Sequence, residues 1–100
     1  MHKEQEITKY SKPSTVFAKL KLLFPYDTGL KFDISTRANK KYMVKGNFSN
    51  DKWIHFGQMG YQDYTLHGDS FRRKLFQSRN SRWKNAEPNT PAYLSYQLLW

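Results

Sequence analysis

The sequence contains no cysteine. Disulfides, thiolate zinc sites and cysteine nucleophiles are therefore excluded. It also has no apolar run long enough to cross a bilayer. Residues 1–16 include two glutamates and lack the apolar stretch of a signal peptide. We therefore expect synthesis in the cytoplasm and no membrane span.

Acidic residues are scarce. Eight aspartates and glutamates stand against 17 lysines and arginines, which gives a formal net charge of +9. Such a surplus in a small domain predicts a polyanionic partner, usually nucleic acid. The alternative is that the charge suits packing inside a large assembly whose other members are acidic. Composition leaves both alternatives open, with a membrane surface as a third.

The chain of 100 residues is long enough for one domain with a modest core. Aromatic residues make up 17% of the chain, so a few large rings must supply much of the burial. The beginning of the chain is polar and lacks periodicity, which predicts a flexible N-terminal arm over residues 1–13. Residues 14–100 are expected to form a single small domain.

Residues 14–24, "STVFAKLKLLF", fit two kinds of element. Val16, Leu20 and Leu23 fit one face of a helix, whereas alternate residues from Val16 onwards fit one face of a strand. The turn "PYDTG" follows, and then residues 30–35 alternate between apolar and polar. Two alternating runs around such a turn are typical of a hairpin, so we favour the strand for the first run.

Residues 41–46 and 52–57 predict two more short strands, joined by the polar loop "NFSND". The sequence thus predicts a short antiparallel meander over about residues 15–57. A glycine-rich connector at residues 58–68 and two helices follow it. The expected fold class is α+β, with the meander followed by a basic helix and a C-terminal helix.

The basic helix is predicted over residues 69–83, with Asp69 as its N-cap. Thr90 and Pro91 provide the N-cap and first-turn residues of the C-terminal helix, over residues 91–100. In the basic helix, Phe71, Leu75, Phe76 and Trp83 share one face, with Arg73, Lys74 and Gln77 opposite, in solvent.

Arg79 and Arg82 fall inside the apolar sector of this helix, where a guanidinium must be paired, stacked or offered to a partner. One interpretation is that Asp63 pairs with an arginine and fastens the glycine-rich segment to the helix. The other is that the arginines bind a phosphate or a partner carboxylate. The residues expected to contact a partner are Arg72, Arg73, Lys74, Arg79, Arg82 and Lys84. The residues expected to be structural are Asp63, His67, Asp69, Gly57 and Gly60.

The segment "DYTLHGD" raises the question of a metal or catalytic site at Asp63, His67 and Asp69, with His55 as a fourth ligand. Its spacing matches no ligand pattern that we can justify, and "FGQMG" does not meet the glycine pattern for dinucleotides. We therefore expect no enzymatic activity, no cofactor and no metal. The enzymatic alternative would be a nuclease. Aromatic rings beside basic residues could stack on nucleobases, although in a small protein such rings are more often core.

The chain from about residue 40 to residue 100 resembles a family of small basic proteins of unknown function in large DNA viruses that infect eukaryotes. The resemblance rests on an F-G pair at 56–57, a glycine at 60, the element D-Y-T-x-H-x-D at 63–69 and a closing L-S-x-x-L-L-W at 94–100. A helix rich in arginine and lysine lies between them.

This resemblance implies a viral protein and brings no established activity with it. Without enzymatic motifs, a small basic viral protein is expected in the virion, as a minor capsid or cement protein that bridges larger capsid proteins through acidic surfaces. The alternative is a nucleic-acid-binding protein that contacts the genome, DNA or RNA, through the basic helix at residues 69–84.

Overall fold

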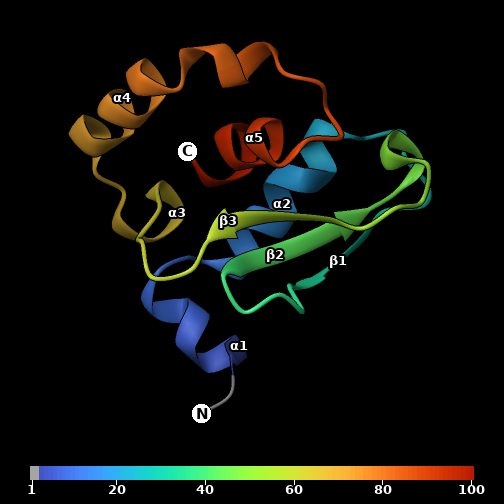
Figure 1. The fold of residues 1–100 in the computed structure, drawn as a ribbon, viewed down its shortest axis with the longest axis horizontal. Helices are drawn as coiled ribbons and strands as arrows, with labels where there is room; N and C mark the ends of the chain where they lie inside the picture. The colour runs from blue at the N-terminus through green and yellow to red at the C-terminus, as the bar shows by residue number, and fades with distance from the viewer. Residues whose placement is uncertain (1–2) are drawn as a thin grey trace.

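A computed structural model of the chain describes residues 3–100. It contains a three-stranded antiparallel sheet in the order β1-β2-β3, followed by helices. The strands are β1 (Lys31–Ile34), β2 (Lys40–Lys45) and β3 (Ile54–Gln58), with the short turn η2 (Asn47–Ser49) between the last two. Figure 1 shows the sheet with helical segments around it. The predicted α+β class, a meander followed by helices, is confirmed.

The register of the sheet places large apolar side chains on one face. Tyr42 on β2 lies opposite Ile34 on β1 and Phe56 on β3. Tyr42, Val44 and Phe56 are fully buried. These three residues form the sheet's contribution to the core, as the alternation of the strands predicts.

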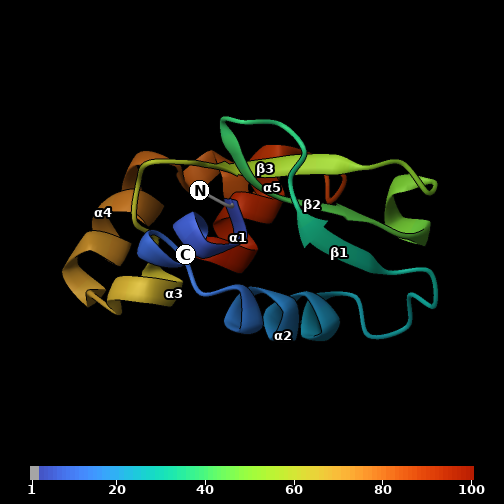
Figure 2. The same cartoon turned by 90° about the horizontal axis from the view of Figure 1, so that it is seen from below.

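The predicted strand at residues 14–24 is wrong, because this segment is the helix α2 (Pro13–Leu23). Pro13 stands at the first helical turn, where its missing N–H costs nothing. Val16 and Leu20, one helical turn apart, are fully buried in the same cluster as Tyr42 and Val44. The helix therefore covers the core, and Figure 2 shows it as a separate layer beside the sheet.

The N-terminal segment packs against the domain. Residues 3–9 form α1 (Lys3–Glu6) and the turn η1 (Ile7–Lys9), and Ile7 is fully buried in the core. The hydroxyl of Tyr42 donates a hydrogen bond to Ser11 Oγ at 2.6 Å. The part of the expected flexible arm that the structure describes thus contributes a core residue, and residues 1 and 2 lie outside the described residues.

Five short helical segments follow the sheet: α3 (Tyr64–His67), α4 (Ser70–Arg79), η3 (Ser81–Asn85), α5 (Pro91–Leu94) and the π-helical η4 (Ser95–Leu99). The predicted caps are confirmed, since Asp69 accepts from the backbone of α4 and Thr90 from that of α5. The basic helix is shorter than predicted. It ends at Arg79 because Asn80 leaves helical geometry, and its side chain donates to the Phe76 carbonyl oxygen at 3.0 Å.

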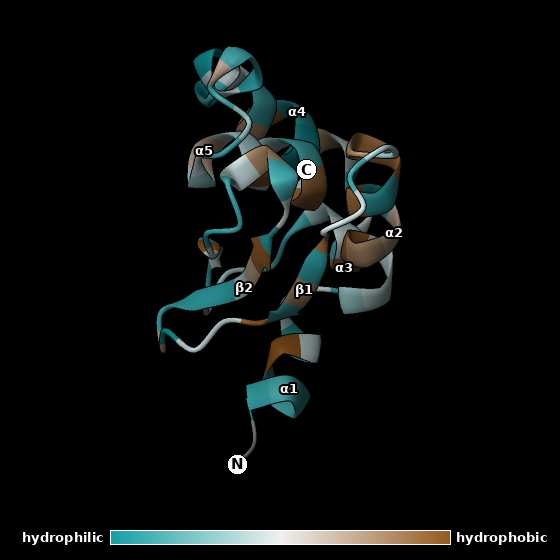
Figure 3. Ribbon diagram, turned by 90° about the vertical axis from the view of Figure 1, so that its right-hand side faces the viewer, coloured by the Kyte–Doolittle hydropathy of each residue, from teal (hydrophilic) through white to brown (hydrophobic). Residues whose placement is uncertain are grey.

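The core lies between the sheet, α2 and the C-terminal segment, which comprises α5, η4 and Trp100. Leu94, Leu98 and Leu99 pack with the sheet residues and α2 in one apolar cluster. Figure 3 shows hydrophobic stretches along β1 and β2 and a hydrophilic α1. No residue of α4 or η3 is buried. None of the helices in residues 3–100 is sufficiently long and apolar to traverse a bilayer.

Candidate binding site

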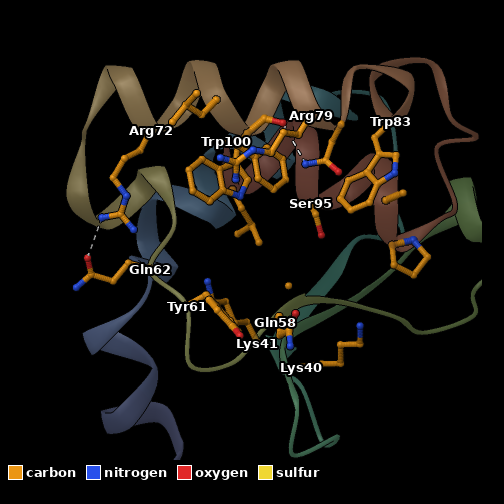
Figure 4. Close-up of a pocket in the computed structure, with 17 residues that line it drawn as sticks. Lys40, Lys41, Gln58, Tyr61, Gln62, Arg72, Arg79, Trp83, Ser95 and Trp100 are labelled. Carbon is orange, nitrogen blue, oxygen red and sulfur yellow. Dashed lines mark hydrogen bonds between the residues drawn. The ribbon is translucent and has the colours of Figure 1, made fainter.

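A pocket of about 600 Å³ lies between α4 and η3 on one side and the sheet on the other (Figure 4). The C-terminal segment also lines it. The size of the pocket falls within the range of ligand pockets, roughly 300–1,000 Å³. The lining residues come from four parts of the chain. They are Arg72, Leu75, Phe76, Arg79, Asn80 and Trp83 from α4 and η3, Lys40, Lys41, Gly57 and Gln58 from the sheet, Tyr61 and Gln62 from the connector, and Pro91, Ala92, Ser95, Leu99 and Trp100 from the C-terminal segment.

The charged side chains that line this pocket are all positive. Lys40, Lys41, Arg72 and Arg79 are its ionisable side chains apart from Tyr61, and no aspartate or glutamate lines it. Within residues 3–100, only Lys41 of these four cations belongs to an ion pair. Arg72 donates a long hydrogen bond of 3.5 Å to Gln62 Oε1. The pocket therefore carries uncompensated positive charge that favours an anion.

Four aromatic rings also line the pocket. Phe76 and Trp100 stack on each other, with ring centroids 4.3 Å apart and planes 7° from parallel. Trp83 meets Phe76 edge to face at 5.9 Å. Tyr61 lies on the other side of the pocket and is 65% exposed (Figure 4). The pocket thus combines flat apolar surfaces with cations.

Behind the pocket, Lys41 of β2 forms a buried ion pair with Asp63. Lys41 Nζ lies 2.9 Å from Asp63 Oδ2, and the two side chains are 3% and 1% exposed. Asp63 also accepts hydrogen bonds from the backbone N–H and the hydroxyl of Thr65. Burial lowers the pKa of Lys41, and the Asp63 carboxylate opposes this shift.

The prediction that Asp63 pairs with an arginine of the basic helix is therefore wrong. Asp63 does fasten the connector, but it fastens it to the sheet through Lys41. The reason is positional: the Asp63 backbone N–H donates to the Tyr10 carbonyl oxygen at 2.9 Å, which holds this residue in the interior of the domain and away from α4. A buried carboxylate needs a buried partner, and Lys41 is the cation within reach.

The helical periodicity predicts that Arg73 faces solvent, and this prediction is wrong. Its Nε donates a hydrogen bond of 2.7 Å to the carbonyl oxygen of Trp100. Its guanidinium also lies over the ring of Tyr64, 4.7 Å from the centroid. Arg73 therefore ties α4 to α3 and to Trp100, and its charge is engaged within the protein.

The other cations predicted to contact a partner divide into two groups. Arg72 and Arg79 line the pocket, on the same face of α4 as Leu75 and Phe76. Lys74, Arg82 and Lys84 are exposed and do not line it, and we call these three the outer cations. Within the described chain none of the five forms an ion pair. The structure thus separates two cationic sites that the sequence presents as one.

His67 and Asp69 organise the junction between α3 and α4. The backbone N–H of Asp69 donates to His67 Nδ1 at 2.9 Å, so this nitrogen carries no proton. The Asp69 carboxylate accepts from the backbone N–H groups of Phe71 and Arg72. Burial lowers the pKa of His67, and the positive charge of Arg72 lowers it further. In the part of the chain that the structure describes, no three histidine, aspartate or glutamate side chains are grouped to hold a metal ion.

The two glycines expected to be structural both adopt positive φ, 79° at Gly57 and 92° at Gly60. At Gly57 there is a second constraint, because an added Cβ would lie 2.9 Å from Leu99 Cδ1 and 3.1 Å from Lys41 Cβ. Gly57 therefore allows the C-terminal segment to approach β3. Gly60 has open space around it, so only its backbone conformation favours glycine.

Several pocket residues were not predicted from the sequence, above all Lys40, Lys41 and Trp100. Nothing in the strand pattern distinguishes Lys41, which is buried, from Lys40, which reaches the pocket. Trp100 is the last residue of the L-S-x-x-L-L-W element at 94–100, and this element was the available sign that it has a role.

The model of a family of unknown function, DUF5754, matches residues 30–80, which extend from the sheet through α4. No curated protein and no solved structure matches the chain.

Proposed function

The chain belongs to the DUF5754 family, and from this premise we propose that it is a non-enzymatic structural protein of a virion. In this proposal it is a minor capsid or cement protein, made in the host cytoplasm, that bridges larger capsid proteins through their acidic surfaces. Two features support the viral setting: the resemblance to small basic proteins of large DNA viruses, and the net charge of +9. The molecule measures 35 × 34 × 20 Å, which suits a crevice between larger subunits.

The observation that carries the proposal is the state of the outer cations. Lys74, Arg82 and Lys84 are exposed, and among residues 3–100 they have no acidic partner. A single exposed ion pair contributes little to binding, but clustered charge of one sign creates a field that attracts a surface of opposite sign. An acidic capsid protein would supply that surface.

A second candidate function is binding to nucleic acid through the basic segment at residues 69–84. The specific observation in its favour is that aromatic rings and unpaired cations line the same pocket. Contacts with phosphates release counterions, so the affinity would fall steeply between about 50 and 200 mM salt. A binding curve that does not change with salt, or no binding at all, would exclude this candidate.

The proposed function is tested by following the protein through disassembly of purified particles. We expect it to stay with the protein shell after the genome is released. The variant Lys74→Glu/Arg82→Glu/Lys84→Glu should no longer bind stripped shells, because its outer charge is reversed. The matched control Lys9→Glu/Lys31→Glu/Lys52→Glu changes the net charge equally at exposed lysines elsewhere and should still bind.

Two results would contradict the proposal. One is that the protein leaves the shell together with the genome, and the other is that it is absent from purified particles. Equal loss of shell binding in both triple variants would show that net charge alone is responsible, which would also count against a specific surface. Far-ultraviolet circular dichroism of each variant establishes that the fold is retained.

A further inference from the structure

We propose that the pocket between α4 and β3 binds one nucleotide, with the base among the aromatic rings and the phosphate held by Arg72 and Arg79. This goes beyond the proposed function, because the outer cations do not line the pocket. The protein could bind a nucleotide whether or not it also binds capsid proteins.

The rings provide the first part of the argument. Tyr61 lies on one side of the pocket, and Trp83 and Trp100 lie on the opposite side (Figure 4). Tyr61 makes no ring contact within the described chain and is mostly exposed, so burial in the core does not explain its place at the pocket. A nucleobase has two flat faces that stack on aromatic side chains whatever the base is. The pocket therefore suits a flat aromatic ligand.

The cations provide the second part. Arg79 lies on the face of α4 that also carries Leu75 and Phe76, and within residues 3–100 it has no ion-pair partner. Arg72 reaches the same pocket from about two turns earlier on the helix. Within residues 3–100, its side chain makes one hydrogen bond, the long one to Gln62. Guanidinium groups bind phosphate oxygens through two parallel hydrogen bonds. The ligand should therefore carry a phosphate beside its ring system.

Polar groups that can pair with the edge of a nucleobase lie near the rings. Gln58, Asn80 and Ser95 line the pocket, and Figure 4 shows Ser95 in the space between its two sides. Asn80 uses its Nδ2 in a hydrogen bond to the Phe76 carbonyl oxygen, which leaves its Oδ1 as an acceptor. The edge of a base presents donors and acceptors that can match such groups.

The same chemistry can come from a free nucleotide or from one residue of a single strand. The full-length protein is therefore titrated at about 50 mM salt with nucleoside monophosphates and, separately, with a single-stranded decanucleotide. Calorimetry measures the affinity. Tryptophan fluorescence reports on Trp83 and Trp100 at the pocket, together with Trp53, which does not line it. Binding of the mononucleotide would indicate a free nucleotide as ligand, and binding of the strand alone would indicate a nucleotide within a chain. Either result supports the proposal.

Matched variants locate the site. Arg72→Gln/Arg79→Gln should weaken binding at least about tenfold, since it removes charged hydrogen bonds to the phosphate. Lys74→Gln/Arg82→Gln removes the same charge from the outer cations and should change the affinity less than about threefold. Tyr61→Leu should weaken binding and leave the fold intact, because this side chain is largely exposed.

Four results would overturn the proposal. They are no binding of either ligand by the folded wild-type protein, equal weakening by both charge variants, competition by inorganic phosphate as strong as by the nucleotide, and displacement of the nucleotide by an acidic peptide that binds more tightly. The second would indicate unspecific polyanion binding, the third a phosphate site without base recognition, and the last a peptide site. Retention on stripped shells depends on the outer cations, so failure here is distinguishable from failure of the proposed function.

Discussion

The sheet side of this molecule and its basic side bury very different amounts of side chain. On the sheet side, apolar residues from η1, α2, β2, β3 and the C-terminal segment form one cluster that is almost fully buried. On the basic side, α4 and η3 contain no buried residue, and Phe71 is 71% exposed. We therefore expect the stability of the fold to come mainly from the buried cluster of the sheet side. The basic side is held by few contacts and leaves space for a ligand.

Three side chains of α3 and α4 contact Trp100. Phe76 stacks on its ring, Arg73 donates to its carbonyl oxygen, and His67 lies 5.4 Å from its ring centroid. The α4 helix is therefore attached through Phe76 and Arg73, whereas the side chains of Arg72 and Arg79 line the pocket. This is the arrangement expected of a binding surface on a stable scaffold.

The largest effect is expected at the ion pair that joins the connector to the sheet. Asp63→Asn leaves the Lys41 ammonium group buried without its counterion, so the free energy of unfolding should fall by about 3–5 kcal/mol. Denaturant unfolding followed by circular dichroism measures this change. A loss below about 1 kcal/mol would contradict the structural role of the pair. As a control, Lys41→Met/Asp63→Asn removes both charges, keeps a side-chain oxygen that accepts from Thr65, and should recover most of the loss.

A pair of leucine substitutions tests the comparison directly. Leu98→Ala creates a cavity in the core and should lower the free energy of unfolding by about 2–5 kcal/mol. Leu75→Ala on α4, where the side chain is 38% exposed, should cost less than about 1 kcal/mol. Denaturation curves of the two variants measure both losses, and a larger loss for Leu98→Ala would confirm that the sheet side contributes more to stability. Equal losses would show that both sides contribute alike.

The smallest effect concerns acidification. The pKa of His67 is lowered in the folded state, first by burial and then by Arg72, against the opposing effects of Asp69 and Asp63. The unfolded chain therefore takes up the proton first, near pH 6.5, and stability should fall as the pH drops below about 6.5. Burial also lowers the pKa of His55, whose Nδ1 bonds to Ser35 Oγ at 2.7 Å, so the sheet side contributes in the same direction.

The two histidines are separated by substitution. His67→Asn retains an acceptor for the Asp69 backbone N–H and removes the titration at the basic side, so the loss of melting temperature between pH 7.5 and 5.5 should become smaller. His55→Asn should reduce the same loss at the sheet side. An unchanged pH dependence in His67→Asn would show that protonation of His67 does not disturb the α3–α4 junction.

Short-range features of the fold could be predicted. The three strands fall within two residues of their predicted limits, and Asp69 and Thr90 cap the helices that they were expected to cap. The failures share one cause, which is that the deciding contacts are distant in sequence. Val16 and Leu20 fit a strand as well as a helix until the sheet and the C-terminal segment are present to bury one helical turn.

The candidate site was predictable in residue type and not in arrangement. The sequence singles out the cations between residues 72 and 84, but it does not divide them into pocket and outer groups. That division depends on where α4 lies relative to β3 and the C-terminal segment. It also depends on Trp100, which stacks on Phe76 and lies 27 residues beyond the arginine that binds its carbonyl oxygen.

By itself, the sequence determined the positive charge, the strand and cap positions, and the reliance on aromatic side chains, because these follow from composition and from neighbours a few residues apart. The tertiary structure decided the partner of Asp63, the internal use of Arg73 and the existence of the pocket. Each of these is a contact between segments far apart in the chain, and such contacts exist only once the core has brought the segments together.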